Sequence, residues 1–165
     1  MGALADPAIR RAVRFADGYV LSAGSTIEEA AERGAFYRRA ETELGLDPRA
    51  RLPLAINRVV HVVASRRERE EALPHFAGGF LSFYDRWGHD DIRHLGSEER
   101  AFEEAARSHF LFGEPSECLE QIERYREIGI GHIACLMSFA VRDVERIERS
   151  LDLFCERVLP YASRS

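Results

Sequence analysis

Hydrophobic and polar residues follow two different periods along this chain, and each period predicts a different kind of element. Apolar residues three or four positions apart indicate amphipathic helices, and short apolar runs rich in β-branched residues indicate buried strands. Three such runs predict strands, at residues 18–21, 54–63 and 132–137. Because amphipathic helices fill the segments between them, the pattern predicts an α/β fold built from parallel βα units.

Two helices are predicted within the first 45 residues. Asp6 is placed to cap a helix whose first residue is Pro7, because proline at that position loses no hydrogen bond. Thr26 and Glu29 have the spacing of a capping box, which opens a second helix. Gly45 is suited to end that helix.

The remaining helices follow the later strands. Ser65 and Glu68 give a second capping-box signature, which predicts a helix to about residue 84. A polar insertion follows over about residues 85–98, and shorter helices are expected over 98–108, 114–129 and 143–160. The segment "HFLFG" between two of these helices is a short apolar piece with no assigned element.

Three strands form a poor independent parallel sheet. Each is apolar enough to be covered on both faces, and the outer strands would leave long apolar edges open to other chains. We therefore expect a homo-oligomer through exposed sheet edges as one means of covering them.

Length and charge narrow the class of protein. The chain has 165 residues, of which 45% are hydrophobic and 31% charged, which is typical of one globular domain. The net charge of -5 is spread along the helices, which argues against nucleic acid as a partner. No run reaches the ~18 apolar residues that cross a membrane, and the first residues lack a signal-peptide pattern.

Two residue types exclude further chemistry. All 23 basic residues are arginine, so Schiff-base and lysine-nucleophile mechanisms are excluded. The three cysteines, Cys118, Cys135 and Cys155, have no metal-ligand or redox spacing. This usage predicts a reducing, cytoplasmic location.

Two sets of residues have alternative interpretations. His61 shares a predicted strand face with Val59 and Val63, where it is either a hydrogen-bonded core residue or a base, and the core role is commoner. The stretch "HDDIRH", residues 89–94, suggests metal ligands, but its spacing matches no strong motif. We predict a solvated loop there, or a mobile lid, and no metal site.

Four stretches together resemble one family: "GALADPAIRRAVRFADGYVLS", "LAINRVVHVVAS", "GEPSECLEQIERYREIGIGHIACLMSF" and "VERIERSLDLFCERVLP". They are similar to the bacterial-luciferase-like flavin-dependent monooxygenases, also called luciferase-like monooxygenases. The resemblance implies a TIM barrel of which this chain is the C-terminal half, with about three to four parallel strands and flanking helices.

The resemblance also implies the domain boundaries. Residues 1–165 form a single partial barrel domain, from the end of the fifth strand through the eighth helix, with the insertion at about 85–98. We therefore expect a truncated form, or a protein whose other half is supplied by another chain.

By the same resemblance, reduced FMN is the expected cofactor and a deazaflavin is the alternative. The family binds flavin at the carboxyl ends of the strands, with its phosphate near the helix after strand five, where helix N–H groups suit an anion. The cofactor-binding residues implied are Gly2, Ala3, Ala5, Ser22, Ser25, Ser138 and Phe139. Ser22 and Ser25 are better explained as turn residues, and the start of the first helix as a simple cap. Phe139 is equally well explained as a core residue.

Three functions follow from these implications. The first is a monooxygenase that uses reduced FMN and O2 on a small organic substrate, with a flavin reductase as a partner. The second is a non-catalytic half barrel that binds flavin or associates with itself. The third is a deazaflavin-dependent hydride-transfer enzyme. The sequence does not identify catalytic residues.

Overall fold

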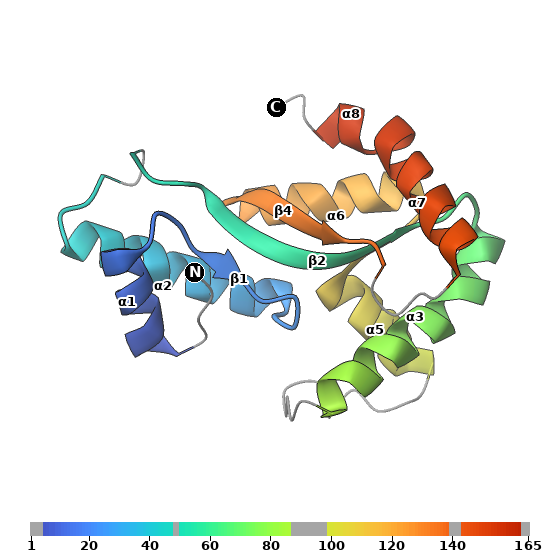
Figure 1. Ribbon diagram of the computed structural model, residues 1–165, viewed down its shortest axis with the longest axis horizontal. Helices are drawn as coiled ribbons and strands as arrows, with labels where there is room; N and C mark the ends of the chain where they lie inside the picture. The colour runs from blue at the N-terminus through green and yellow to red at the C-terminus, as the bar shows by residue number, and fades with distance from the viewer. Residues whose placement is uncertain (1–4, 48–49, 87–98, 139–142, 163–165) are drawn as a thin grey trace. The chain divides into compact units, whose positions relative to one another are not determined.

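The structure is a computed structural model that describes residues 5–47, 50–86, 99–138 and 143–162 (Figure 1). The chain divides into two compact units. Unit 1 contains residues 1–58 and 123–135, and unit 2 contains residues 59–122 and 136–165. The two units are described separately below, and the single-domain assignment stays a prediction.

The sheet has four strands: β1 (Val20–Leu21), β2 (Leu54–Val62), β3 (Phe110–Gly113) and β4 (Ile130–Leu136). The first half of β2 pairs in parallel with β1, with Val20 opposite Ala55. The second half pairs in parallel with β3, with Val59 opposite Phe110, and β4 also pairs with β2. The predicted α/β fold with a parallel sheet is confirmed, and only part of a barrel is present.

Strand β3 was not predicted as a strand. Its four residues are all buried, and the N–H of Val63 donates to the carbonyl of Gly113 at the end of the pairing. Four residues are too few to show a strand period, so β3 depends on its pairing with β2. The other three strands lie within one or two residues of the predicted runs.

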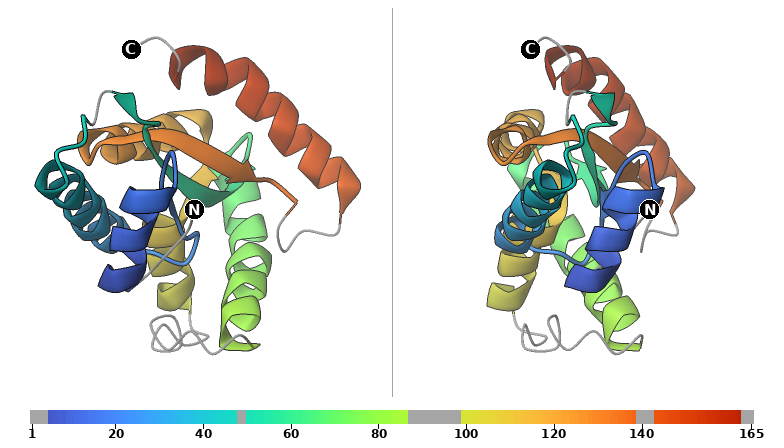
Figure 2. Two further views of the ribbon diagram at one scale, coloured as in Figure 1. Left: turned by 60° about the vertical axis from the view of Figure 1, so that its left-hand side comes forward. Right: turned by 90° about the vertical axis from the view of Figure 1, so that its left-hand side faces the viewer.

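Unit 1 contains α1 (Asp6–Phe15) and α2 (Ile27–Glu43), which lie side by side (Figures 1 and 2). The predicted capping box is confirmed at the start of α2, where Thr26 and Glu29 each accept the other's backbone N–H. Gly45, at φ +67°, follows the helix as predicted. Both signals depend on residues a few positions apart, which is why they could be predicted from the sequence.

The predicted cap of α1 is wrong by one residue. Ala5 is the N-cap, in an extended conformation, and its carbonyl accepts the N–H groups of Ala8 and Ile9. Asp6 is the first helical residue, and no side chain caps the helix. Pro7 tolerates the second position as well as the first, and the Asp6 carboxylate is still favourable beside the positive end of the helix dipole.

Unit 2 contains α3 (Arg66–Arg86) and α5 (Glu99–His109), which lie side by side and pack on the second half of β2. Aromatic rings fill the core between them. Phe110 of β3 meets Phe76 and Phe80 edge-on, at centroid distances of 5.2 and 4.7 Å. This geometry is the one that aromatic quadrupoles favour.

The second capping box is half confirmed. The N–H of Glu68 donates to Oγ of Ser65 over 3.3 Å, as predicted. The Glu68 carboxylate, however, accepts the N–H of Ala64 rather than that of Ser65, over 2.8 Å. The Glu68 side chain therefore bonds to the backbone one residue earlier in the chain than the motif predicts.

The last elements are α6 (Pro115–Glu127), α7 (Val144–Arg157), which Asp143 caps, and α8 (Leu159–Ala162). Of β4, only Ile130 is buried and Ile133 is half-buried. The expectation that every strand is covered on both faces is therefore wrong for β4 within the described chain. No helix in the described ranges is long and apolar enough to cross a membrane.

Candidate functional site

The first candidate site is the loop of residues 22–25, which follows the carboxyl end of β1 in unit 1. In parallel α/β proteins the loops at this end of the strands carry the ligand and catalytic groups. Ser22 and Gly24 are half-buried, whereas Ser25 is only 1% exposed. The side chain and backbone of Ser22 are therefore the more accessible part of this loop.

A buried arginine lies behind the loop. Arg58 is 0% exposed, and its guanidinium donates to three loop carbonyls. Nη1 donates to the carbonyls of Ser22 and Ala23, each over 3.2 Å, and Nη2 donates to that of Ser25 over 2.8 Å. Nη1 also donates to the carbonyl of Asn57, over 3.1 Å.

The fifth acceptor of Arg58 is a tyrosine from α6. Nε of Arg58 donates to the hydroxyl of Tyr125 over 2.5 Å, and the guanidinium carbon lies 4.9 Å from the ring centre. Among the described residues, the acceptors of Arg58 are carbonyl and hydroxyl oxygens, and none is a carboxylate. The sequence analysis did not identify Arg58, although a charged residue within an apolar strand was a visible signal.

The Ser25 hydroxyl is already engaged. It accepts a hydrogen bond from Nη1 of Arg33 over 2.7 Å, and Arg33 also pairs with Glu29 over 3.5 Å. The Ser22 hydroxyl accepts the N–H of Gly24 over 3.2 Å. Of the two serines, Ser22 is thus the more accessible from this loop, and Ser25 supports the loop from within.

The start of α1 fits an anion only partly. Ala5 is exposed, and no side chain of the described residues caps the helix. Pro7 has no N–H, and the N–H groups of Ala8 and Ile9 are both bonded to the Ala5 carbonyl. Within the described residues, the amide of Asp6 is therefore the donor of this turn that has no hydrogen-bond acceptor, and the Asp6 carboxylate would repel a phosphate.

Four of the predicted cofactor-binding residues cannot be placed relative to the loop of residues 22–25. Gly2, Ala3 and Phe139 lie outside the described residues. Ser138 is exposed after β4 and belongs to unit 2. The roles of all seven predicted residues stay predictions.

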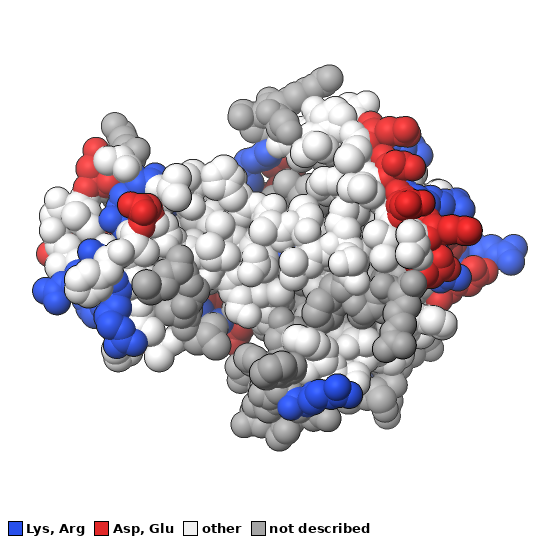
Figure 3. Space-filling model, viewed as in Figure 1, with Lys and Arg blue, Asp and Glu red and all other residues white. Residues whose placement is uncertain are grey.

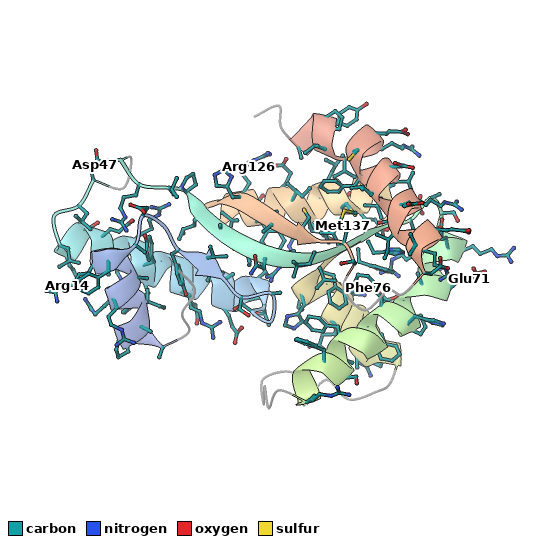
Figure 4. All side chains as sticks on the ribbon, viewed as in Figure 1. Arg14, Asp47, Glu71, Phe76, Arg126 and Met137 are labelled. Atoms are coloured by element: carbon teal, nitrogen blue, oxygen red, sulfur yellow. The ribbon has the colours of Figure 1, made fainter. Side chains whose placement is uncertain are left out.

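His61 belongs to the core of unit 2, on the strand face predicted with Val59 and Val63. It is 4% exposed, and its ring packs against Phe76, labelled in Figure 4, and Phe112, at 5.2 and 6.1 Å between centroids. Burial lowers its pKa from 6.5, and nearby charges act in both directions. Its Nδ1 has no hydrogen-bond partner within the described chain.

An open groove of about 500 Å³ lies beside His61 in unit 2, between the first turns of α3 and α7. Arginine and carboxylate side chains gather on this side of the unit (Figure 3). Most pair with each other: Arg67 with Glu71 over 3.0 Å, and Arg149 with Glu68 over 3.4 Å. The described lining of the groove therefore presents mutually paired charges, with no excess of unpaired cations among those residues.

Metal ligation finds no support in the described part of the chain, where no group of three His, Cys, Asp or Glu residues could hold an ion. The stretch 89–94 lies outside that part. The solvated loop or lid expected there, and the expected absence of a metal site, therefore stay predictions.

A parallel sheet with helices after its strands defines a protein of the α/β class, to which the α/β barrels belong. The family model of luciferase-like monooxygenases matches residues 1–132 of this chain. The chain belongs to the luciferase-like monooxygenase family, as its sequence motifs implied. No curated protein sequence matches it.

Solved structures share the fold. The coenzyme F420-dependent tetrahydromethanopterin reductase of Methanopyrus kandleri has a TM-score of 0.72 and 16% identity, over 99% of this chain and 50% of that one. The oxygenating constituent of 3,6-diketocamphane monooxygenase from Pseudomonas putida, in complex with FMN, has a TM-score of 0.68 and 19% identity. The match covers 96% of this chain and 46% of that one. Monooxygenase RslO1 of Streptomyces bottropensis has a TM-score of 0.69 and 20% identity, over 98% of this chain and 47% of that one. The chain spans about half the length of these structures.

Proposed function

We propose that this chain is the C-terminal half of a flavin-dependent oxidoreductase, which uses reduced FMN and O2 on a small organic substrate. The observation that carries the proposal is the match to the luciferase-like monooxygenase family over residues 1–132. Structural neighbours that are monooxygenases, one of them in complex with FMN, support it. A flavin reductase would supply the reduced cofactor.

In this proposal, the cofactor lies at the loop of residues 22–25. Ser22 and the loop backbone would contact it, and the start of α1 at Ala5 would lie toward its phosphate. When bound, reduced flavin supplies the oxygen chemistry, and the protein contributes orientation and exclusion of water. Ser138 and Phe139 remain candidates for contact with the ring.

The test is a fluorescence titration of the purified chain with FMN at a measured oligomeric state. We expect saturable quenching in the wild type and weaker binding in the Ser22→Ala variant, since alanine removes only the hydroxyl and adds no bulk. The matched control is Ser108→Ala, because Ser108 lies on α5 of unit 2. No saturation at about 100 μM FMN, a weak affinity of about -5 kcal/mol, would contradict flavin binding by this chain.

A deazaflavin is the second candidate cofactor. It is favoured by two structural neighbours, the F420-dependent tetrahydromethanopterin reductase and an F420-dependent secondary alcohol dehydrogenase. A parallel titration with coenzyme F420 distinguishes the two cofactors. Tighter binding of F420 than of FMN would replace the monooxygenase proposal with a hydride-transfer enzyme.

A non-catalytic half barrel is the third candidate, and the exposure of β4 favours it. A strand of a parallel sheet is normally covered on both faces, whereas β4 has a single buried residue, Ile130. A second copy of this chain could cover it. Light scattering across a concentration series tests this self-association. A chain that stays monomeric at all concentrations would contradict the covering of β4 by a second copy.

A further inference from the structure

The acceptors of Arg58 are concentrated on one loop. Three of its four carbonyl partners belong to Ser22, Ala23 and Ser25, and the fourth belongs to its own neighbour, Asn57. A planar guanidinium can serve several acceptors at fixed angles, which an ammonium group cannot do. The carbonyls of this loop are therefore held in one orientation by one side chain.

Packing alone does not explain a charged residue at this position. Arg58 is 0% exposed, and burial of a cation without a carboxylate partner is costly. An apolar side chain of similar volume fills such a space without that cost, and such replacements are often neutral or stabilising. The specific consequence of having arginine here is the fixed shape of the loop.

Tyr125 fixes the arginine in turn. Its hydroxyl accepts from Nε over 2.5 Å while its ring lies against the guanidinium, so both the position and the plane of the Arg58 head group are defined. Hydrogen bonds from a charged donor are stronger than those between neutral groups. The result is a chain of contacts from α6, through β2, to the loop after β1.

We infer that Arg58 is a positioning residue, which holds the loop of residues 22–25 in the shape that the flavin site requires. This inference rests on the proposed function for its link to flavin. A loop that is already ordered pays no further entropy when a ligand binds, so the effect is on affinity. Arg58 itself does not touch the ligand.

The experiment compares Arg58→Met and Arg58→Lys with wild type by two readouts. The first is amide hydrogen exchange at Gly24 and Ser25, relative to Ala30 of α2, whose N–H donates to the Thr26 carbonyl. The second is the FMN dissociation constant from fluorescence. For Arg58→Met we expect exchange at the loop to rise about tenfold relative to Ala30, and FMN affinity to fall about tenfold. Arg58→Lys should be intermediate.

The matched control is Arg51→Met. Arg51 is another largely buried arginine of unit 1 that donates to a backbone carbonyl, that of Ala16, and to the Tyr37 hydroxyl. Its loss should lower stability without a selective effect on the loop, and it should leave the FMN affinity within roughly twofold. Should Arg58→Met fail to fold, Arg58→Lys and Tyr125→Phe provide the same comparison with smaller changes.

Three results would overturn the inference. Exchange at Gly24 and Ser25 that rises only in proportion to Ala30 would make Arg58 a general stabilising residue. Faster exchange at the loop with an unchanged FMN dissociation constant would show that the order of the loop does not affect FMN binding. Absence of FMN binding by the wild type would overturn the proposed function and the link to flavin, while the exchange data would still decide whether Arg58 holds the loop.

Discussion

The Oε1 atom of Glu41 lies 2.9 Å from Nε of Arg51, and the glutamate side chain is 0% exposed. A second arginine, Arg38, donates to its other oxygen over 2.9 Å. Arg51 in turn donates to Tyr37 and to the carbonyl of Ala16, beyond the end of α1. Burial is the largest cause that raises the Tyr37 pKa, so the hydroxyl stays protonated at neutral pH. This buried cluster joins α2 to the chain segments on either side of it.

Replacement of Glu41 tests the cluster. We expect Glu41→Gln to lower the free energy of unfolding by about 3 kcal/mol, because loss of one partner leaves a poorly compensated buried charge. The control is Glu43→Gln on the same helix, where the pair with Arg10 is about half exposed and contributes about 0–1 kcal/mol. Urea denaturation at pH 7 measures the free energy of unfolding of both variants. Equal decreases in the two would contradict a stabilising role for the buried cluster.

His61 should make stability depend on pH. Burial lowers its pKa in the folded state, Glu68 opposes this shift and Arg146 adds to it. Because the unfolded chain then binds the proton more readily, the free energy of unfolding falls as the pH drops below about 6.5.

The variant for this prediction is His61→Phe. Its slope below pH 6.5 should be smaller than that of wild type, by at most about 1.4 kcal/mol per pH unit. At pH 7 the variant should be as stable or more so, because it removes a buried nitrogen that has no hydrogen-bond partner within the described chain. Superimposable pH profiles for the two proteins would contradict the prediction.

The three cysteines should differ in reactivity. Cys118 is fully buried, and its pKa is raised to about 12 by burial and by the charge of Glu117. Cys135 and Cys155 are exposed, and partial burial of the thiol raises the pKa of Cys135. Because the thiolate is the reactive form, we expect iodoacetamide at pH 8 to label Cys155 first, Cys135 next and Cys118 only after unfolding.

Peptide mass mapping over time measures this order. Labelling of Cys118 at the rate of the exposed cysteines in native protein would contradict its burial. Cys135 lies in β4, so its protection at high protein concentration, with Cys155 still labelled, would indicate self-association through that strand. Urea-unfolded protein is the control in which all three should react.

Two glycines should respond in opposite directions to alanine. A Cβ on Gly131 of β4 would lie 2.5 Å from Cβ of Pro53, so Gly131→Ala should cost about 1–3 kcal/mol. A Cβ on Gly78 of α3 would meet nothing within 4 Å, and alanine favours a helix interior, so Gly78→Ala should stabilise by about 0.5–1 kcal/mol. Denaturant midpoints compare them, and destabilisation by Gly78→Ala would contradict the open space beside it.

Local signals explain which elements could be predicted. The capping box at Thr26 and Glu29 and the left-handed glycines Gly45 and Gly129 depend on neighbours within a few residues. Strand β2 was predicted because its nine residues show a clear apolar run. The cap of α1 was misplaced by one residue, because aspartate is a preferred capping residue, whereas the helix begins at Asp6 and the backbone of Ala5 caps it without a side-chain hydrogen bond.

The sequence by itself determined the family, the alternation of strands and helices, and most helix ends, because periodicity and caps are local properties of the chain. The tertiary structure decided strand β3, which is too short to have a period and exists through its pairing with β2. It also decided the hydrogen bonds of Arg58, whose acceptors lie up to 67 positions away in the chain. Contacts of that range arise only when the chain has folded, so no sequence pattern predicted them.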